Sequence, residues 1–73
     1  MILDARGRRC PLPILDLARQ IDAVDVGATI TVEADDPAAR PDIQAWCRMR
    51  AQEYVGERVA ADGTPSYQVR RLC

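Results

Sequence analysis

Two prolines, Pro11 and Pro13, restrict where the first helix of this chain can begin. Proline has no N–H to donate inside a helix, but the first turn tolerates it because those N–H groups have no intrahelical partner. Since Pro13 also biases Leu12 away from helical dihedrals, the start can lie at Pro11 or at Pro13. Cys10 lies at the mouth of the helix in both cases. The apolar residues that follow recur at helical spacing and predict an amphipathic helix to about residue 24: Ile14, Leu17, Ala18, Ile21 and Val24.

The position of Cys10 predicts a thiol that loses its proton more readily than usual. A helix N-terminus carries partial positive charge and stabilises an anion by about 0.3–1 kcal/mol. Arg6, Arg8 and Arg9 stand just before the cysteine. Each positive charge stabilises the thiolate by a further roughly 0.6 kcal/mol at ~7 Å in a water-like dielectric. Together these effects lower the thiol pKa by about one unit from ~8.5, so we expect a substantial thiolate fraction near neutral pH.

Four short segments have the pattern of β-strands. Residues 28–34 give the clearest case, because small or apolar residues alternate there with threonine and glutamate. A first strand covers residues 1–5 before a tight loop at Arg6-Gly7. Two more strands, 57–61 and 66–72, flank a turn at 62–65 and are expected to form a hairpin.

A second helix is expected after the pair Asp35-Asp36, which we interpret as a cap before Pro37. Pro41 predicts an irregular opening turn, with regular helix from about Asp42. Gly56 is expected to end the helix in the left-handed conformation. The residues at helical spacing in between are Ile43, Trp46, Cys47, Ala51 and Tyr54.

The element order β-α-β-α-β-β predicts an α/β (α+β) two-layer sandwich that forms one domain over residues 1–73. A four-stranded mixed sheet carries both helices on one face. The side chains expected to face the helices are Ile30, Val32, Val59, Tyr67 and Val69. The opposite face is polar enough to meet water and carries Thr29, Thr31, Glu33, Gln68 and Arg70.

Composition excludes several kinds of site. The chain has no histidine, which rules out a Cys–His nucleophile pair and any metal site that uses histidine. Its three cysteines, Cys10, Cys47 and Cys73, are widely spaced, so neither a disulfide framework nor a zinc site is expected. The net charge of −1 gives no argument for nucleic acid or an anionic membrane as an obligatory partner. With no signal peptide and no membrane-spanning run, we expect free thiols in a reducing cytoplasm and no membrane insertion.

Two blocks of the sequence are similar to the TusA-like (SirA-like) sulfur-carrier family. The family's opening pattern, Asp-x-Arg-Gly-x-x-Cys-Pro-x-Pro, is met by Asp4, Arg6, Gly7, Cys10, Pro11 and Pro13. Its second block is met by Asp35, Asp36, Pro37, Ala38, Asp42, Ile43, Trp46 and Cys47. The resemblance covers essentially the whole chain and implies the same two-layer β-α-β-α-β-β fold.

The resemblance implies a sulfurtransferase that acts as a sulfur-relay protein. In the family the cysteine of Cys-Pro-x-Pro accepts sulfane sulfur as a persulfide, which makes Cys10 the implied carrier and implies no cofactor beyond that covalent persulfide. The implied partners are a cysteine desulfurase or rhodanese-type donor and a downstream acceptor protein. Relatives serve tRNA 2-thiouridine synthesis, sulfur oxidation and cofactor biosynthesis; Leu12 stands where tRNA-thiolation members often carry an acidic residue, which leaves the pathway open. The residues expected to support the thiol are Arg6, Gly7, Arg9, Pro11 and Pro13.

Four other residues that could carry chemistry also have simple interpretations. Cys47 and Trp46 lie on the apolar stripe of the second helix and are assigned to the core. Asp4 is expected to pair with Arg6 or with N–H groups of the loop. Cys73 is either an incidental thiol or a second sulfur-handling group.

Two other functions stay open beside the sulfur carrier. One is a non-catalytic interaction or regulatory module in which the cysteine loop is only structural. The other is an RNA-binding domain, suggested by ten arginines and by the sandwich topology. The net charge of −1 and the expected lack of exposed aromatic residues count against direct nucleic-acid binding.

Overall fold

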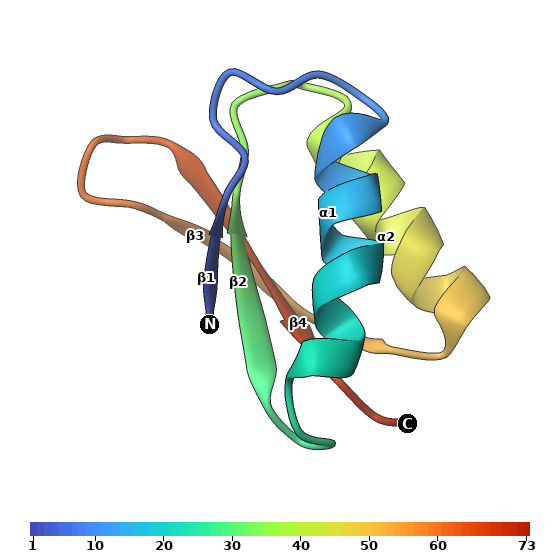
Figure 1. Ribbon diagram of the computed structural model, residues 1–73. Coiled ribbons are helices and arrows are strands. Elements are labelled where there is room, and N and C mark those ends of the chain that lie inside the picture. The colour runs from blue at the N-terminus through green and yellow to red at the C-terminus, as the bar shows by residue number, and fades with distance from the viewer.

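The computed structural model describes residues 1–73 and shows both helices on one face of a four-stranded sheet (Figure 1). This arrangement confirms the predicted two-layer α+β sandwich with the order β-α-β-α-β-β. The elements are β1 (Ile2–Asp4), α1 (Leu12–Gln20), a 3₁₀ turn η1 (Ile21–Ala23), β2 (Thr29–Glu33), α2 (Ala39–Arg50), β3 (Glu53–Val59) and β4 (Pro65–Arg70). Neither helix is long and apolar enough to cross a membrane.

The sheet is mixed and has the strand order β1-β2-β4-β3. β1 runs parallel to β2, and α1 forms the crossover between them. β4 pairs antiparallel with both β2 and β3. The predicted hairpin of the last two strands is confirmed, although its first strand begins earlier, at Glu53, and carries a register shift between Tyr54 and Gly56.

One hydrophobic core fills the space between the sheet and the helices. Four of the five sheet residues predicted to face the helices are buried there, but Val59 is 72% exposed, so that prediction is wrong. Val59 pairs with Pro65 at the end of the hairpin, which extends beyond the helices (Figure 1). Its side chain therefore has no helix to pack against. The opposite face of the sheet is polar, as predicted, with half-buried Thr29, Thr31, Glu33 and Gln68 and exposed Arg70.

The boundaries of α2 differ from the prediction at both ends. The helix begins at Ala39, because Pro41 lies within its first turn and is tolerated there. It ends at Arg50, and its C-cap residue Ala51 adopts the left-handed conformation with φ 56° and donates its N–H to the Cys47 carbonyl. Gly56 is therefore not the stop; it lies in β3 beside the register shift, and Tyr54 is a strand residue.

α1 begins at Leu12, between the two starts that the prolines allowed, with Pro11 as its N-cap residue. Pro13 occupies the second helical position, and η1 continues the chain to Ala23, near the predicted end. The N-terminal ends of α1 and α2 lie at the same end of the sandwich (Figure 1). The loop from β1 to α1 therefore meets the loop from β2 to α2.

Candidate functional site

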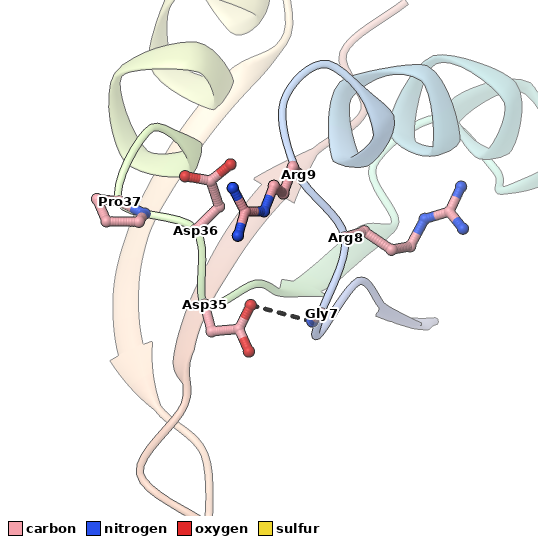
Figure 2. Close-up of a pocket in the computed structure, with 6 residues that line it drawn as sticks. All are labelled: Gly7, Arg8, Arg9, Asp35, Asp36 and Pro37. Carbon is pink, nitrogen blue, oxygen red and sulfur yellow. Dashed lines mark hydrogen bonds between the residues drawn. The ribbon is translucent and has the colours of Figure 1, made fainter.

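Cys10 is an exposed residue in the loop between β1 and α1. The loop turns at Gly7, whose φ of 75° is a left-handed conformation that favours glycine. Two carboxylates from the segment before α2 hold the loop in place. The Gly7 N–H donates to Asp35 Oδ1 at 3.0 Å (Figure 2), and the Cys10 N–H donates to Asp36 Oδ2 at 2.9 Å. The thiol is thus presented by a loop whose backbone is tied to the second helix segment.

Asp36 connects the cysteine loop to the turn that leads into α2. Its Oδ1 accepts a hydrogen bond from the Ala38 N–H at 3.0 Å, while its Oδ2 accepts the one from Cys10. These two backbone hydrogen bonds, from Ala38 first and then from Cys10, lower the pKa of the Asp36 carboxyl. No side chain caps α2 itself, so the predicted role of Asp36 as a helix cap is replaced by a role in the preceding turn.

Arg6 pairs with carboxylates and not with the thiol. Its Nε lies 2.9 Å from Asp4 Oδ1, which confirms the predicted pair, and its Nη1 lies 2.6 Å from Asp62 Oδ2. The hydrogen bond from Arg6 is the largest cause that lowers the pKa of Asp4 to about 2. Hydrogen bonds from Thr64, and then from Arg6, lower the pKa of Asp62 to about 2. Arg6 therefore fastens the end of β1 to the β3–β4 turn.

The other two arginines before Cys10 also face carboxylates. Arg8 Nε lies 2.8 Å from Asp16 Oδ2 on α1. The side chain of Arg9 points toward Asp36 in Figure 2, and its positive charge contributes to the lowered pKa of that carboxyl. The supporting electrostatic role predicted for Arg9 is thus directed at the carboxylate that holds the loop.

The pKa of the Cys10 thiol is raised above its ordinary value, so the predicted lowering is wrong. The largest cause is the Asp42 carboxylate, a hydrogen-bond acceptor that favours the protonated thiol; partial desolvation follows, and the negative charges of Asp42 and Asp36 add to it. The expected effect of the helix N-terminus is weakened because the Leu12 N–H donates to the Arg9 carbonyl at 2.8 Å. The thiol consequently favours its protonated form.

A mainly apolar groove of about 230 Å³ lies between the first turn of α1 and one face of α2 and contains Cys10. Pro11 lines this groove, whereas Pro13 is buried, and the Cys10–Pro11 peptide bond is cis. Asp42 is the only carboxylate among the lining residues; it belongs to the family's second sequence block, but the sequence analysis assigns it no role. The helical spacing of the sequence could have placed Asp42 at the groove, because it puts Asp42 on the same face of the helix as three other groove residues: Ala45, Trp46 and Met49.

A second hollow, of about 390 Å³, flanks the loop before Cys10 and is mainly polar (Figure 2). It is lined by Gly7, Arg8, Arg9, Asp35, Asp36 and Pro37. The predicted supporting residues Gly7 and Arg9 thus lie together on this side of the loop. No group of three or more histidine, cysteine, aspartate or glutamate side chains is arranged to hold a metal ion.

The other two thiols have different surroundings. Cys47 is buried, and burial raises its pKa to about 11, which confirms its assignment to the core. Trp46 is also buried, with the Arg50 guanidinium 5.7 Å from its ring centroid. Cys73 is exposed near the C-terminal end of α2, where its Sγ lies 3.9 Å from the Ala51 carbonyl oxygen. It lies at the opposite end of the molecule from the cysteine loop (Figure 1).

The fold and the site define a small α+β protein with one exposed thiol in a carboxylate-held loop at the start of a helix. Comparison with protein families identifies the family of the chain, because the family model for sulfurtransferase TusA matches residues 1–71. The chain therefore belongs to the TusA family.

Two individual proteins illustrate the similarity. YrkF of Bacillus subtilis (strain 168), whose name describes it as a candidate sulfur carrier protein, is 30% identical over 56 residues. That match covers 77% of this chain but only 30% of YrkF, so the chain spans less than a third of this relative's length. A SirA-like protein from Desulfitobacterium hafniense has the same fold, with a TM-score of 0.82, 20% identity and full coverage of both chains.

Proposed function

We propose that this chain carries sulfane sulfur as a persulfide on Cys10 and relays it from a donor protein to an acceptor protein. Membership of the TusA family and the similarity to YrkF support the sulfur-carrier role. The observation that carries the choice of Cys10 is its exposure beside an apolar groove in a held loop. Cys47 is buried, and no groove contains Cys73.

The proposed reaction is a thiol–persulfide exchange that needs no cofactor. The Cys10 sulfur, after losing its proton, attacks the outer sulfur of the donor's persulfide; a new S–S bond forms and the donor's S–S bond breaks. The donor leaves as a thiolate, and Cys10 becomes Cys10–S–SH without net oxidation. Because neither of the other cysteines stands beside Cys10, no thiol within the chain displaces the bound sulfur.

The proposed partners follow from this chemistry and from the family. The donor is a protein that bears a persulfide, of the cysteine desulfurase or rhodanese type, and the acceptor supplies a cysteine thiolate. The acceptor's pathway is tRNA 2-thiouridine synthesis, sulfur oxidation or cofactor biosynthesis. A reducing cytoplasm is the proposed location, because the carrier thiol has to stay free between loads.

Intact-mass measurement after incubation with a sulfur donor tests the proposal. The chain is mixed either with a cysteine desulfurase and cysteine, or with a rhodanese and thiosulfate. We expect the wild-type chain to gain one sulfur, about 32 Da, which a reductant removes as it removes other reversible thiol caps. Peptide mapping should place the added mass on Cys10.

Two matched serine variants separate the thiols. Cys10→Ser should gain no sulfur, whereas Cys73→Ser, which removes the other exposed thiol, should load like the wild type. Loading of Cys10→Ser to the wild-type extent contradicts the proposal. In that case an interaction module with a structural cysteine loop becomes the better description.

A further inference from the structure

The groove beside Cys10 exposes apolar surface of the two helices. Besides Cys10, its apolar lining residues include Pro11, Ile14, Trp46 and Met49. Met49 is 79% exposed although its side chain is apolar, and Pro11 is also exposed. A contiguous apolar surface of this kind marks a binding site more often than a single exposed apolar side chain does.

The size and place of the groove indicate what it can hold. Its volume of about 230 Å³ lies below the roughly 300–1,000 Å³ of typical small-molecule sites, so it has room for side chains rather than for a cofactor. Because Cys10 is one of its lining residues, an occupant of the groove lies beside the sulfur. In the proposed function, the molecules that approach this sulfur are proteins that carry a cysteine. The groove therefore fits a segment of such a protein.

The end of the groove next to Cys10 carries an unpaired negative charge. Asp42 lies in the first turn of α2, lines the groove and takes part in none of the ion pairs. Its Oδ2 is buried and has no hydrogen-bond partner. No arginine lines the groove, and the charge of Arg9 in the cysteine loop acts on Asp36. A basic residue of a partner protein is consequently favoured at this end.

Arg50, the last residue of α2, places a positive charge at the other end of the groove. Its guanidinium lies 5.7 Å from the ring centroid of Trp46, which lines the groove. Arg50 is exposed and, like Asp42, belongs to no ion pair. From residue 42 to residue 50 the helix rises by about 12 Å. The groove is therefore negative beside Cys10 and positive about two helical turns away.

We propose that this groove docks the persulfide-bearing segment of the sulfur donor protein in one orientation. The donor segment places a basic residue beside its cysteine against Asp42, an apolar side chain between Ile14 and Met49, and an acidic residue near Arg50. This inference rests on the proposed sulfur-carrier function and names the chemistry of the partner. The sulfur step remains the thiol–persulfide exchange, and docking adds no new bond.

A second copy of the chain is the rival occupant, because opposite charges at the two ends also complement each other in an antiparallel pair. Two observations favour the donor segment. A second copy would cover Cys10, the thiol that the sulfur-carrier function needs exposed. A groove of about 230 Å³ also supplies little of the roughly 1,000 Å² that a stable interface buries.

Capture of synthetic peptides by Cys10 tests the orientation. Arg-Cys-Leu-Ala-Glu has its basic residue beside the cysteine, and Glu-Cys-Leu-Ala-Arg has the same composition with the charges exchanged. Both have blocked termini, and one carries an isotope label. An extended peptide of this length spans about 13 Å between its charged residues.

Each peptide is added as its disulfide-linked dimer. The Cys10 thiolate attacks one sulfur of the dimer, one peptide stays attached through the new S–S bond, and the other leaves as a thiolate. Intact mass at equilibrium then gives the ratio of the two adducts. Cys73 supplies the matched reference, because it is exposed and neither hollow contains it. Cys73→Ser reports the ratio at Cys10, and Cys10→Ser reports the ratio at Cys73.

We expect the first peptide to be favoured at Cys10 about threefold or more relative to its ratio at Cys73, since one exposed ion pair changes an equilibrium constant by up to about fivefold. Asp42→Asn and Arg50→Gln, each added to Cys73→Ser, should lower this preference. Arg58→Gln is the control at an exposed site on β3 without an ion pair, and it should leave the preference unchanged. Equal ratios at Cys10 and Cys73 overturn the inference.

A third peptide, Arg-Cys-Ser-Ala-Glu, tests the apolar contact. Cys10 should capture the leucine peptide several-fold better than the serine peptide, because leucine buries apolar surface in the groove. Met49→Ser should reduce this preference, whereas Val59→Ser, which removes a similarly exposed apolar side chain outside the groove, should not. Equal capture of the two peptides overturns the inference. A wild-type dimer in sedimentation that Met49→Ser dissociates also overturns it, because the groove then belongs to a second copy.

Sulfur loading separates this inference from the proposed function. If the wild type gains sulfur on Cys10 but shows no preference among the peptides, the inference fails and the sulfur-carrier function stands. If the wild type gains no sulfur from any donor, the proposed function fails. The donor protein then fails as the occupant of the groove as well, whatever the peptides show.

Discussion

The backbone N–H of Cys10 donates a 2.9 Å hydrogen bond to Oδ2 of Asp36, across a separation of 26 residues in the sequence. The same carboxylate accepts a hydrogen bond from the Ala38 N–H through its other oxygen. One side chain therefore fixes the thiol loop and the turn before α2 relative to each other. The position of the sulfur depends on this side chain as well as on the start of α1.

Replacing Asp36 with alanine should loosen the thiol loop. We expect the amide hydrogens of Cys10 and Ala38 to exchange with solvent about fivefold faster or more, the factor that corresponds to one typical net hydrogen bond. Hydrogen exchange followed by NMR measures both amides. Asp35→Ala is the matched control. It should speed exchange at Gly7, because the Gly7 N–H donates its hydrogen bond to the Asp35 side chain. Unchanged exchange at Cys10 in Asp36→Ala would show that the loop is held by other contacts.

The Arg6 cluster should make the stability of the fold depend on acid. The carboxyl groups of Asp4 and Asp62 each have a pKa of about 2 in the folded chain, below the ordinary value of about 4. A lowered folded-state pKa stabilises the fold above the unfolded value, and this contribution is lost as the pH falls from about 4 through about 2.

The measurement for this cluster is the thermal midpoint as a function of pH in the wild type and in Arg6→Gln. At pH 7 the variant should melt at a lower temperature, and the difference should disappear by about pH 2 as both carboxylates are protonated. Arg19→Gln removes the same charge from an exposed site with no ion pair and should follow the wild type. A constant difference between Arg6→Gln and the wild type from pH 7 to pH 2 contradicts this account.

Residue patterns within one element predicted most of the fold. Ile43, Trp46 and Cys47 recur at helical spacing, and all three are buried. The β2 alternation and the closing hairpin are local patterns of the same kind and are also confirmed. These features are predictable because each is decided by neighbours in the sequence.

The errors arose where distant contacts or backbone geometry decide the structure. Val59 fits the alternation of apolar and polar residues along its strand, but it is exposed. The sequence does not show that the helices stop short of it. The sequence predicts the end of α2 at Gly56 because glycine favours the left-handed conformation, whereas Ala51 adopts that conformation in the structure. The thiol pKa was predicted from the arginines near Cys10 in sequence, although the groups that set it, Asp42 and Asp36, come from the second helix segment.

Cys47→Ala should damage stability and leave sulfur loading intact. The Cys47 thiol is buried in the core, so removing its sulfur leaves a small cavity that costs roughly 1–2 kcal/mol. For a chain of this size each kcal/mol lowers the melting temperature by about 4–8 °C. Thermal unfolding and intact mass after sulfur loading test the two halves of the prediction. A variant that melts like the wild type yet takes up no sulfur would contradict the assignment of Cys47 to the core.

Ala51→Gly should stabilise the protein. Ala51 ends α2 with φ 56°, a conformation that costs a residue with a Cβ about 1 kcal/mol and costs glycine little. Part of that gain is offset because glycine has more freedom in the unfolded chain, so we expect a net increase of about 0.5 kcal/mol in the free energy of unfolding. Ala45→Gly is the opposite control: it makes the same substitution at an exposed position inside the helix and should cost about 0.8–1 kcal/mol. Denaturant unfolding measures both variants, and a loss of stability in Ala51→Gly as large as that in Ala45→Gly would show that Ala51 is not the left-handed end of α2.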